Sequence, residues 1–346
     1  MKLKEFATIN MGQSPKGETY NLDGNGMPFL QWRKTFGRIY PTIDTWTTDP
    51  IKIANKDEIL MSVRAPVGDM NFANQEICIG RGLCSINAKN GRNKYLYYML
   101  LNSMSDLKQK STGTVFDSIN RNDLENLEIN FHSDDEQLKI ENILSSIDSK
   151  IELNNEINNN LYELIKNNYE ALISNCDWEE VELGTIANIT SGKRPVDKLE
   201  IGKYPVIGAN GIMAYTSDFN FDEDIIITGR VGTLGVVKRY VEQIWATDNT
   251  LVSQTKYLNY IENYMKTIDY YSLNRGSTQP LLTQGDLKKQ IIMFNEEAIL
   301  RFEKENQIFV DKIRNNVKEN KNLEQLRDTL LPKLMNGEID LDNIEI

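Results

Sequence analysis

The chain has 346 residues, of which 40% are hydrophobic and 26% are charged, and this length favours at least two globular domains. No apolar run approaches the roughly 20 residues needed to span a bilayer. The N-terminal segment lacks the apolar centre of a signal peptide, so we expect a cytoplasmic location and no membrane partner. The three cysteines, Cys78, Cys84 and Cys176, are not spaced as a zinc site and are expected to be buried, reduced thiols.

The net charge of −11 is unevenly distributed along the sequence. Residues 1–132 carry 16 basic and 14 acidic groups, and residues 178–293 carry 12 and 14, so both segments are near neutral. Residues 133–177 carry 3 basic and 10 acidic groups, and residues 294–346 carry 8 and 12. The acidity is therefore concentrated in the two segments with helical patterns, and the other two can still present basic faces to nucleic acid.

Segments of the first half recur in the same order in the second half. The pairs are "INMGQSP" (9–15) with "ITSGKRP" (189–195), "MPFLQ" (27–31) with "YPVIG" (204–208), "DEILMSVRAPVG" (57–68) with "EDIIITGRVGTLG" (223–235), and the helical stretches 94–110 with 259–274. The third pair places Arg64 and Arg230 at equivalent positions after a strand. Polar segments with an Asp-Leu pair follow in both halves, 111–129 and 275–293. Over all these segments the offset drifts from 180 to 162 residues, as a duplication with loop deletions would give. The sequence therefore predicts a two-fold internal repeat, each unit being a mixed α/β globule followed by a long helix.

Two segments, 134–173 and 296–339, have the apolar spacing of three and four residues that describes one face of a helix. The apolar residues are Ile140, Leu144, Ile147, Ile151, Ile157, Leu161, Leu164 and Leu172 in the first, and Phe302, Phe309, Ile313, Val317, Leu323, Leu326, Leu330 and Leu334 in the second. Asn154 and Asn158 interrupt the first stripe, as buried polar residues do where register matters. Pro332 is expected to end or kink the second helix, and Gly337 to mark its end.

The expected fold class is α+β. Two mixed α/β globular domains would be joined and separated by two long antiparallel helices of coiled-coil type, with a pseudo-two-fold internal repeat. The expected boundaries are 1–133 for the first domain, 134–175 for the first helical region, 176–294 for the second domain, and 295–346 for the second helical region and tail. A plain helical hairpin that only holds two domains together is the alternative to a ruler that fixes their separation.

The sequence lacks recognisable catalytic motifs. His132 is the only histidine, at a domain–helix junction, and is expected to be solvated or capping. No H-E-x-x-H or Cys/His metal set is present, and "SGKRP" (191–195) lacks the other residues of a P-loop. "GRVGTLG" (229–235) precedes a segment with a strand pattern, so it is not a dinucleotide fingerprint. The chain is therefore interpreted as a binding protein without a metal or catalytic site.

Four segments carry a resemblance to a known family. They are "SVRAPVGD" (62–69), "CIGRGL" (78–83), "IGANGI" (207–212) and "LRDTLLPKLMNGEIDL" (326–341). The first two are similar to one common type of target-recognition domain, and the third is similar to another. The last resembles the usual close of a second helical region. Over nearly its whole length, the chain thus resembles the specificity (S) subunit of a type I restriction–modification enzyme.

The resemblance implies a division of labour. Each target-recognition domain would read one half of a bipartite, asymmetric site in double-stranded DNA. The helical regions would set the unread spacer and dock two methyltransferase (M) subunits, and restriction (R) subunits would be reached through them. S-adenosylmethionine, ATP and Mg would belong to those partners, so the chain itself would hold no cofactor and perform no enzymatic step.

Base-reading candidates follow from side-chain chemistry, because arginine suits guanine and glutamine or asparagine suits adenine. The candidates are Lys16, Gln31, Arg33, Lys34 and Arg64 in the first domain, and Lys193, Arg194, Asn210, Arg230 and Gln279 in the second. Arg64 and Arg230 could equally be structural, and Trp32 could stack on DNA or lie in the core. For methyltransferase docking the candidates are Leu331, Leu334 and Met335, which could instead pack against the adjacent domain.

Two other functions remain open from the sequence. One is a scaffold whose two heads grip a protein rather than DNA. The other is a bifunctional enzyme with its own nuclease or methyltransferase centre, which the missing "[ND]PP[FY]" tetrapeptide and glycine-rich cofactor loop disfavour.

Overall fold

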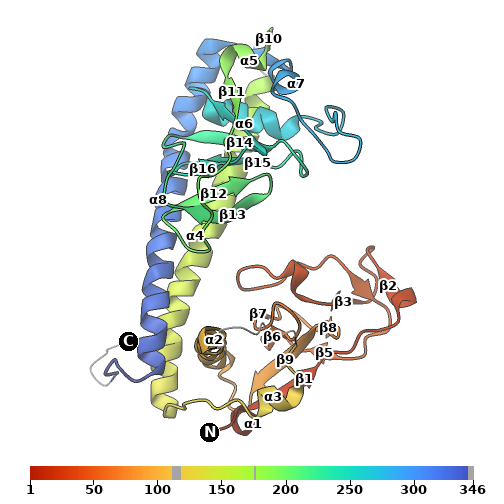
Figure 1. The fold of residues 1–346 in the computed structure, drawn as a ribbon, viewed down its shortest axis with the longest axis vertical. Coiled ribbons are helices and arrows are strands. Elements are labelled where there is room, and N and C mark those ends of the chain that lie inside the picture. Colours follow the sequence, from red (N-terminus) through yellow and green to blue (C-terminus); the bar gives the residue numbers. More distant parts are fainter. Residues whose placement is uncertain (111–117, 175–176, 342–346) are drawn as a thin grey trace. The chain divides into compact units, whose positions relative to one another are not determined.

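The structure is a computed structural model that describes residues 1–110, 118–174 and 177–341. The chain divides into two compact units (Figure 1). Unit 1 comprises Met1–Glu152 together with Lys321–Ile346, and unit 2 comprises Leu153–Asn320. Each unit is described by itself below.

Unit 1 contains two sheets and a helix that packs on one of them. Its elements before the long helices are α1 (Leu3–Phe6), β1 (Ala7–Met11), η1 (Gly17–Thr19), β2 (Tyr20–Asn21), β3 (Met27–Leu30), η2 (Arg33–Thr35), β4 (Trp46–Thr47), β5 (Ile53–Ala54), β6 (Ile59–Ser62), β7 (Met70–Phe72), β8 (Ile77–Ile79), β9 (Leu83–Ala88), α2 (Asn93–Lys110) and α3 (Arg121–Glu125). One sheet has the antiparallel order β1-β9-β6-β7, and the other has the order β2-β4-β3-β8-β5, in which β3 and β8 are parallel.

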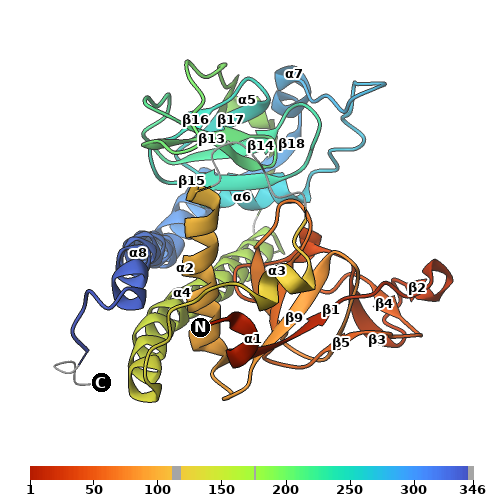
Figure 2. The same cartoon turned by 60° about the horizontal axis from the view of Figure 1, so that its bottom comes forward.

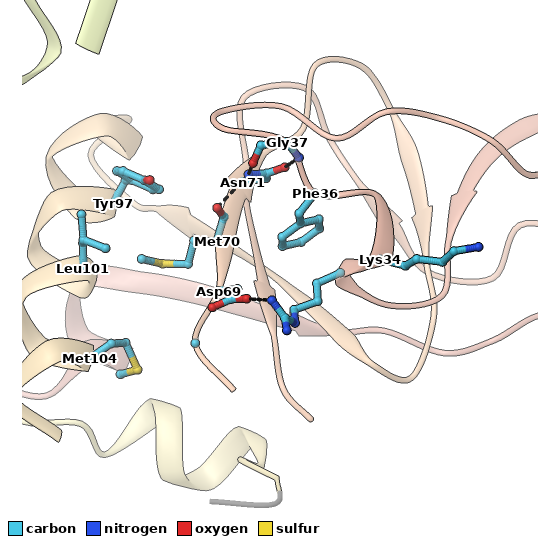
Figure 3. Close-up of a pocket in the computed structure, with 11 residues that line it drawn as sticks. Lys34, Phe36, Gly37, Asp69, Met70, Asn71, Tyr97, Leu101 and Met104 are labelled. Carbon is cyan, nitrogen blue, oxygen red and sulfur yellow. Dashed lines mark hydrogen bonds and ion pairs between the residues drawn. The ribbon is translucent and has the colours of Figure 1, made fainter. Parts of the chain in front are cut away.

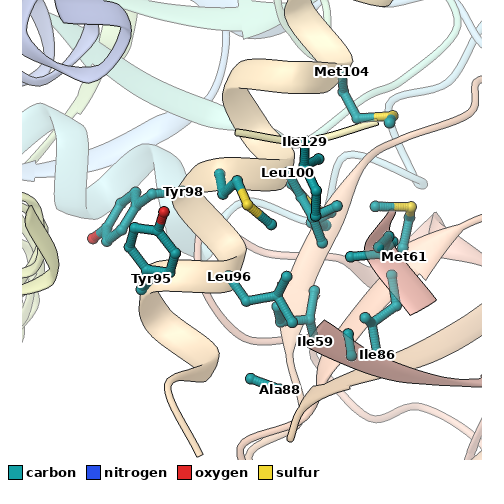
Figure 4. Close-up of a cluster of buried hydrophobic side chains, with 14 of the residues drawn as sticks. Ile59, Met61, Ile86, Ala88, Tyr95, Leu96, Tyr98, Leu100, Met104 and Ile129 are labelled. Atoms are coloured by element: carbon teal, nitrogen blue, oxygen red, sulfur yellow. The ribbon is translucent and has the colours of Figure 1, made fainter. Parts of the chain in front are cut away.

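The main core of unit 1 lies between α2 and the four-stranded sheet. Figure 4 shows Leu96 and Leu100 of α2 facing Ile59, Met61 and Ile86 of the sheet. The strands bury runs of apolar residues because both faces of this sheet are covered.

Unit 2 repeats this architecture. Its elements are β10 (Glu179–Glu182), α5 (Leu183–Ile186), β11 (Asn188–Ser191), β12 (Tyr204–Gly208), β13 (Gly211–Thr216), β14 (Ile225–Gly229), β15 (Val237–Tyr240), β16 (Trp245–Ala246), β17 (Thr250–Gln254), α6 (Leu258–Thr267), α7 (Gln284–Lys288) and β18 (Ile291–Phe294). The sheet β11-β17-β14-β15 is antiparallel, and in the sheet β13-β12-β16 the last two strands are parallel. A third sheet pairs β10 with β18. The short helices α5 and α7 lie side by side, as α1 and α3 do in unit 1 (Figures 1 and 2).

Backbone hydrogen bonds confirm the internal repeat. The amide of Gly12 donates to the carbonyl of Leu83 (2.9 Å), and that of Gly192 donates to Thr250 (3.2 Å). The amide of Gly80 donates to Leu30 (2.8 Å) as that of Thr247 does to Ile207 (3.0 Å). These bonds reproduce the predicted offsets of 180 and 177 residues.

The long helices are α4 (Asp134–Ser174) and α8 (Glu296–Met335), and each contributes residues to both units. Within unit 1, Arg327 of α8 bonds Asp148 of α4 (3.0 Å). Within unit 2, Asn320 pairs with Asn154 and Asn306 pairs with Asn168, so the segments run antiparallel there (Figure 1).

Some details of the helix predictions are wrong. Pro332 does not end α8, which continues to Met335, and a kink at Pro332 stays a prediction. The predicted stop at Gly337 is confirmed, since Gly337, at φ +71°, adopts a left-handed conformation just after the helix. The amides of Gly337 and Glu338 donate to the carbonyls of Leu334 and Lys333, a Schellman arrangement.

The predicted apolar stripes contain three exposed residues, Leu164, Val317 and Leu326, because a spacing of three and four also admits a neighbouring face. The predicted helix 259–274 ends early, since α6 stops at Thr267. The carboxylate of Asp269 accepts hydrogen bonds from the amides of Tyr271 (3.1 Å) and Ser272 (3.4 Å), and such a turn competes with helix.

Candidate nucleic-acid interface

At one edge of unit 1, the segments that follow β1, β3, β6 and β8 cross closely. The amide of Gln13 donates to the carbonyl of Ile79 (2.9 Å), and that of Val63 donates to Gly82 (2.9 Å). A Cβ atom on Gly12 would lie 2.1 Å from the carbonyl oxygen of Gly80. The close approach at Gly12 therefore requires a residue without a side chain, and the crossings bring four loops to a single surface.

A small polar network occupies this edge. The hydroxyl of Ser14 donates to Oε1 of Gln31 (2.9 Å) and accepts from the backbone amide (3.2 Å) and Nε (3.5 Å) of Arg81. Arg81 is exposed. Ser14 and Arg81 were not among the predicted readers, although "GQSP" and "CIGRGL" contain them. Each is one polar residue in a loop, and only the crossing of the loops sets them beside Gln31.

Three other candidate residues of unit 1 are exposed but differ in their contacts. Lys16 is exposed, with Nζ 3.9 Å from a carboxylate oxygen of Glu18. Arg64 is exposed next to the crossing made by Val63. Trp32 is 59% exposed, so it is not a core residue, and it covers Gly82.

Arg33 and Lys34 line an open cavity of about 690 Å³ beside α2 (Figure 3). The guanidinium of Arg33 forms an ion pair with Asp69. Figure 3 shows Lys34 extending away from the cavity. The side-chain amide of Asn71 bonds both the N–H and the carbonyl of Gly37 (3.0 Å each), which holds this loop in place. Asp69 thus offsets the charge of Arg33, whereas the Lys34 side chain carries its charge away from the cavity.

The corresponding edge of unit 2 has the same backbone crossings. The amide of Lys193 donates to Ala246 (2.9 Å), and the amide of Arg230 donates to Asn249 (2.8 Å). A Cβ atom on Gly229 would lie 1.9 Å from the carbonyl oxygen of Thr233 and 3.0 Å from Cβ of Ala209. The loops that carry Lys193, Arg194, Asn210 and Arg230 therefore converge, and all but Arg230 are exposed.

Gln279 lies in a loop that joins this edge through the bond from the amide of Gly232 to the carbonyl of Pro280 (2.9 Å). In the same loop, the guanidinium of Arg275 donates to Asp286 (2.8 Å). Hydrogen bonds from Arg275 and Thr283 lower the pKa of Asp286 to about 2, so its carboxylate is ionised at neutral pH. Gln279 is exposed, whereas the charge of Arg275 is offset.

The predicted equivalence of Arg64 and Arg230 is wrong by one residue. The amide of Ile119 donates to the carbonyl of Val63 (3.0 Å), and that of Leu282 donates to the carbonyl of Arg230 (2.8 Å). Arg230 therefore corresponds to the buried Val63, and its Nη1 donates to the carbonyl of Asp248 (3.3 Å). Successive residues of a strand point to opposite sides, so a one-residue shift separates the roles of the two arginines.

The predicted docking residues Leu331, Leu334 and Met335 are buried in the main core of unit 1. Their burial favours the alternative that the sequence left open, in which they pack against the adjacent domain.

The histidine and the described cysteines lie in surroundings that suit a structural role rather than a catalytic one. His132 is half-buried, and its Nδ1 lies 2.8 Å from the hydroxyl of Tyr95. Cys78 and Cys84 are buried free thiols, and burial raises the pKa of Cys84 to about 12. A thiol with so high a pKa is a poor nucleophile at neutral pH. Cys176 lies outside the described residues.

Among residues 1–110, 118–174 and 177–341, no group of three or more His, Cys, Asp or Glu side chains could hold a metal ion. Within the same ranges, the helices are all too short or too polar to cross a bilayer.

The whole chain is similar to known proteins. Residues 1–163 and 175–326 each match the family described as the type I restriction modification DNA specificity domain. The type I restriction enzyme MjaIX specificity subunit of Methanocaldococcus jannaschii is 26% identical over 99% of this chain and 94% of its own length. A second chain from that organism, described as a type I restriction enzyme specificity subunit, MjaX, is 40% identical over 43% of this chain, but over only 36% of its own length.

The crystal structure of the type I restriction–modification system S subunit from M. genitalium has the same fold. Its TM-score is 0.57, with 20% identity, over 97% of this chain and 95% of that one. Both halves of the sequence match the family, and the fold contains the repeat that those two matches require. The chain therefore belongs to the family of type I restriction–modification DNA specificity subunits.

Proposed function

We propose that this chain recognises a bipartite, asymmetric sequence in double-stranded DNA, and that unit 1 and unit 2 each read one half. The observation that carries this proposal is the loop edge described above, which both units build with the same backbone hydrogen bonds but fill with different side chains. Gln13 and Ser14 of unit 1 correspond to Lys193 and Arg194 of unit 2, and Arg81 corresponds to Asp248. One framework with two sets of polar groups is suited to reading two different sequences.

Within this interface we assign different tasks to the residues. Gln31, Arg64 and Arg81 in unit 1, and Arg194, Asn210 and Gln279 in unit 2, are exposed or half-exposed and suited to base edges. Lys16, Lys34 and Lys193 would bind phosphates. Arg33 and Arg230 would orient their loops, because one is paired with Asp69 and the other bonds the Asp248 carbonyl. Trp32 would stack against a base or the sugar–phosphate backbone.

The domain plan is proposed on the same basis. Residues 1–133 and 176–294 would be the target-recognition domains, and 134–175 and 295–346 the helical regions that set the spacer between half-sites. The helical regions would also dock two methyltransferase subunits, with restriction subunits bound through them. Because Leu331, Leu334 and Met335 are buried, exposed apolar residues are better candidates for that contact. Leu153 and Leu164 are 50% and 40% exposed and lie about three turns apart on one side of α4.

Specificity subunits are generally not catalytic, and we propose the same for this chain. S-adenosylmethionine, ATP and Mg would then be bound only by the partner subunits. The rival bifunctional enzyme predicts that the isolated chain binds S-adenosylmethionine, which isothermal titration would detect.

The test is to co-express the chain with its methyltransferase partner and map methylated adenines genome-wide, with and without this gene. The expected result is one split sequence motif that disappears with the gene. A DNA pool selected on the purified complex should return the same motif. If no split motif appears in either experiment, while the complex binds a protein through the two units, the scaffold function is correct instead.

A further inference from the structure

Within unit 2, buried asparagines form part of the seam between α4 and α8. The seam residues of α4 are Asn154, Asn158, Leu161, Ile165, Asn168 and Leu172, and those of α8 are Phe302, Asn306, Phe309, Ile313, Asn316 and Asn320. Both sets have the alternating spacing of four and three residues that a coiled coil uses. Five of the six asparagines are between 0% and 8% exposed.

The asparagines face one another across the seam. Nδ2 of Asn154 donates to Oδ1 of Asn320 (2.9 Å), and Nδ2 of Asn316 donates to Oδ1 of Asn158 (2.8 Å). Nδ2 of Asn168 donates to Oδ1 of Asn306 (2.9 Å). The same register aligns Leu161 with Ile313, Ile165 with Phe309, and Leu172 with Phe302. Every seam asparagine of unit 2 therefore meets an asparagine, and every apolar seam residue meets an apolar one.

This matching holds in only one register. If α8 slipped by one heptad in one direction, Asn154, Asn158 and Asn168 would face Ile313, Phe309 and Ile299. A slip in the other direction would set Asn168 against Ile313, Asn316 against Ile165 and Asn320 against Leu161. Each such layer sets an asparagine amide against an apolar side chain, and where the asparagine is buried this is strongly unfavourable, whereas an all-apolar seam tolerates either slip.

From this pattern we infer that the three asparagine pairs lock the register of α4 and α8, and that they thereby determine the spacer length that the chain accepts between its half-sites. The second part rests on the proposed function. A slip of one heptad moves one helix by about 10 Å along the other, which corresponds to roughly three base pairs of duplex. A subunit that recognises two half-sites at one fixed spacing therefore requires a helix pair that does not slip by a heptad.

The register can be measured without DNA by disulfide cross-linking of the full chain. The pair I165C/F309C reports the native register, and I165C/F302C and L172C/F309C report the two slipped registers. These pairs are compared in the natural seam and in a seam in which N154L, N158L, N168L, N306L, N316L and N320L are combined. The matched control is N159L/N315L, which makes the same change at exposed positions of the same two helices.

In the natural seam and in the control, only the native pair should form, as mapped by mass spectrometry. In the leucine seam, at least one slipped pair should form to a tenth or more of the native yield. If the leucine seam forms the native pair alone, other contacts of unit 2 fix the register, and the inference is overturned.

The consequence for DNA is measured with the methyltransferase complex. The leucine seam should add methylated sites whose spacers differ from the natural one by about three base pairs, whereas the control should not. A slipped register with an unchanged spacer would refute the link to spacing but leave DNA reading intact. If the natural complex methylates no split motif, the proposed function fails, while the cross-linking result still decides whether the asparagines lock the register.

Discussion

In each unit, an ion cluster of one aspartate and two arginines connects the globular part to the long helices, but the aspartate lies on opposite sides of this contact. In unit 1 the acid is on the helix, where Asp148 of α4 accepts from Arg38 (2.8 Å), the hydroxyl of Tyr98 (2.7 Å) and Arg327 (3.0 Å). Burial, and next the nearby Asp148 carboxylate, raise the pKa of Tyr98. In unit 2 the acid is on the sheet side, where Asp224 accepts from Arg239 (2.6 Å) and also binds Arg314 of α8.

This reversal shows which properties the repeat retains. The order of the four-stranded sheet and the loop crossings recur in both units, since they depend on backbone hydrogen bonds. The ion clusters do not recur, because any arrangement that pairs the buried charges satisfies the same requirement. The seam differs in a similar way. In unit 1 the α4 residues that continue it, Ile140, Leu144, Ile147 and Ile151, are all apolar, whereas unit 2 uses asparagines.

The largest expected effect comes from breaking the acid–arginine clusters. Asp148→Asn leaves Arg38 and Arg327 without their shared carboxylate and should destabilise unit 1 by about 3 kcal/mol. Hydrogen exchange should accelerate in α2 but not in α6, and Asp224→Asn should do the reverse. Glu152→Gln is the control, because this half-exposed partner of Arg38 lies 3.6 Å away and should cost less than about 1 kcal/mol. If α2 exchanges hydrogen at the same rate in Asp148→Asn as in the natural chain, this account of unit 1 is contradicted.

The substitutions Arg81→Ala and Arg194→Ala test the contributions of the two loop edges to DNA recognition separately. If each arginine reads a base, each substitution should cost about 1–3 kcal/mol of discrimination, and only in the half-site of its own unit. Binding of the methyltransferase complex to a panel of duplexes with single-base changes measures this. Uniform weakening over all sequences would make the residue a phosphate contact instead.

The asparagine seam gives an intermediate effect. Asn158→Leu leaves the Asn316 amide buried opposite an apolar side chain and should destabilise the helix pair by about 2 kcal/mol. The double change N158L/N316L should recover most of that loss, because two leucines pack without an unpaired amide. Denaturant unfolding of the four chains of this double-mutant cycle measures the coupling. Additive losses would show that the two asparagines do not act as a pair.

The smallest expected effect is a pH dependence specific to unit 2. Burial raises the pKa of Glu303 on α8, although its carboxylate accepts from the backbone amides of Asn259 (3.2 Å) and Tyr260 (2.8 Å) at the start of α6. A raised pKa in the folded state means that the stabilising contribution is present below the unfolded value of about 4.3 and is lost as the pH rises through the folded value.

The stability of the natural chain relative to Glu303→Gln should therefore fall as the pH rises from 4 towards neutrality. Hydrogen exchange in α6 at several pH values measures this difference. The exposed Glu305→Gln on the same helix is the control and should show no such slope. If the stability difference between the natural chain and Glu303→Gln does not change with pH, the surroundings of Glu303 do not favour its protonated, neutral form.

The sequence predicted elements well where a local pattern defines them. The spacing of Ile140, Leu144 and Ile147 predicted α4, and the order of matching segments predicted two copies of one globule. The pattern was less reliable at faces and ends. It included the exposed Leu164 in the seam, and it extended α6 beyond Thr267, because a preference for helix does not include the competing turn at Asp269.

The sequence by itself determined the helices and the repeat, since these follow from periodicity and order along the chain, and its motifs carried the resemblance to the family. Only the tertiary structure decided that Arg230 corresponds to Val63 rather than Arg64, that Arg81 lies beside Gln31, and that Leu334 is buried. The physical reason is that these properties depend on which distant backbone segments cross and in which register. A shift of one residue leaves composition and periodicity almost unchanged, but it turns a side chain from the surface to the core.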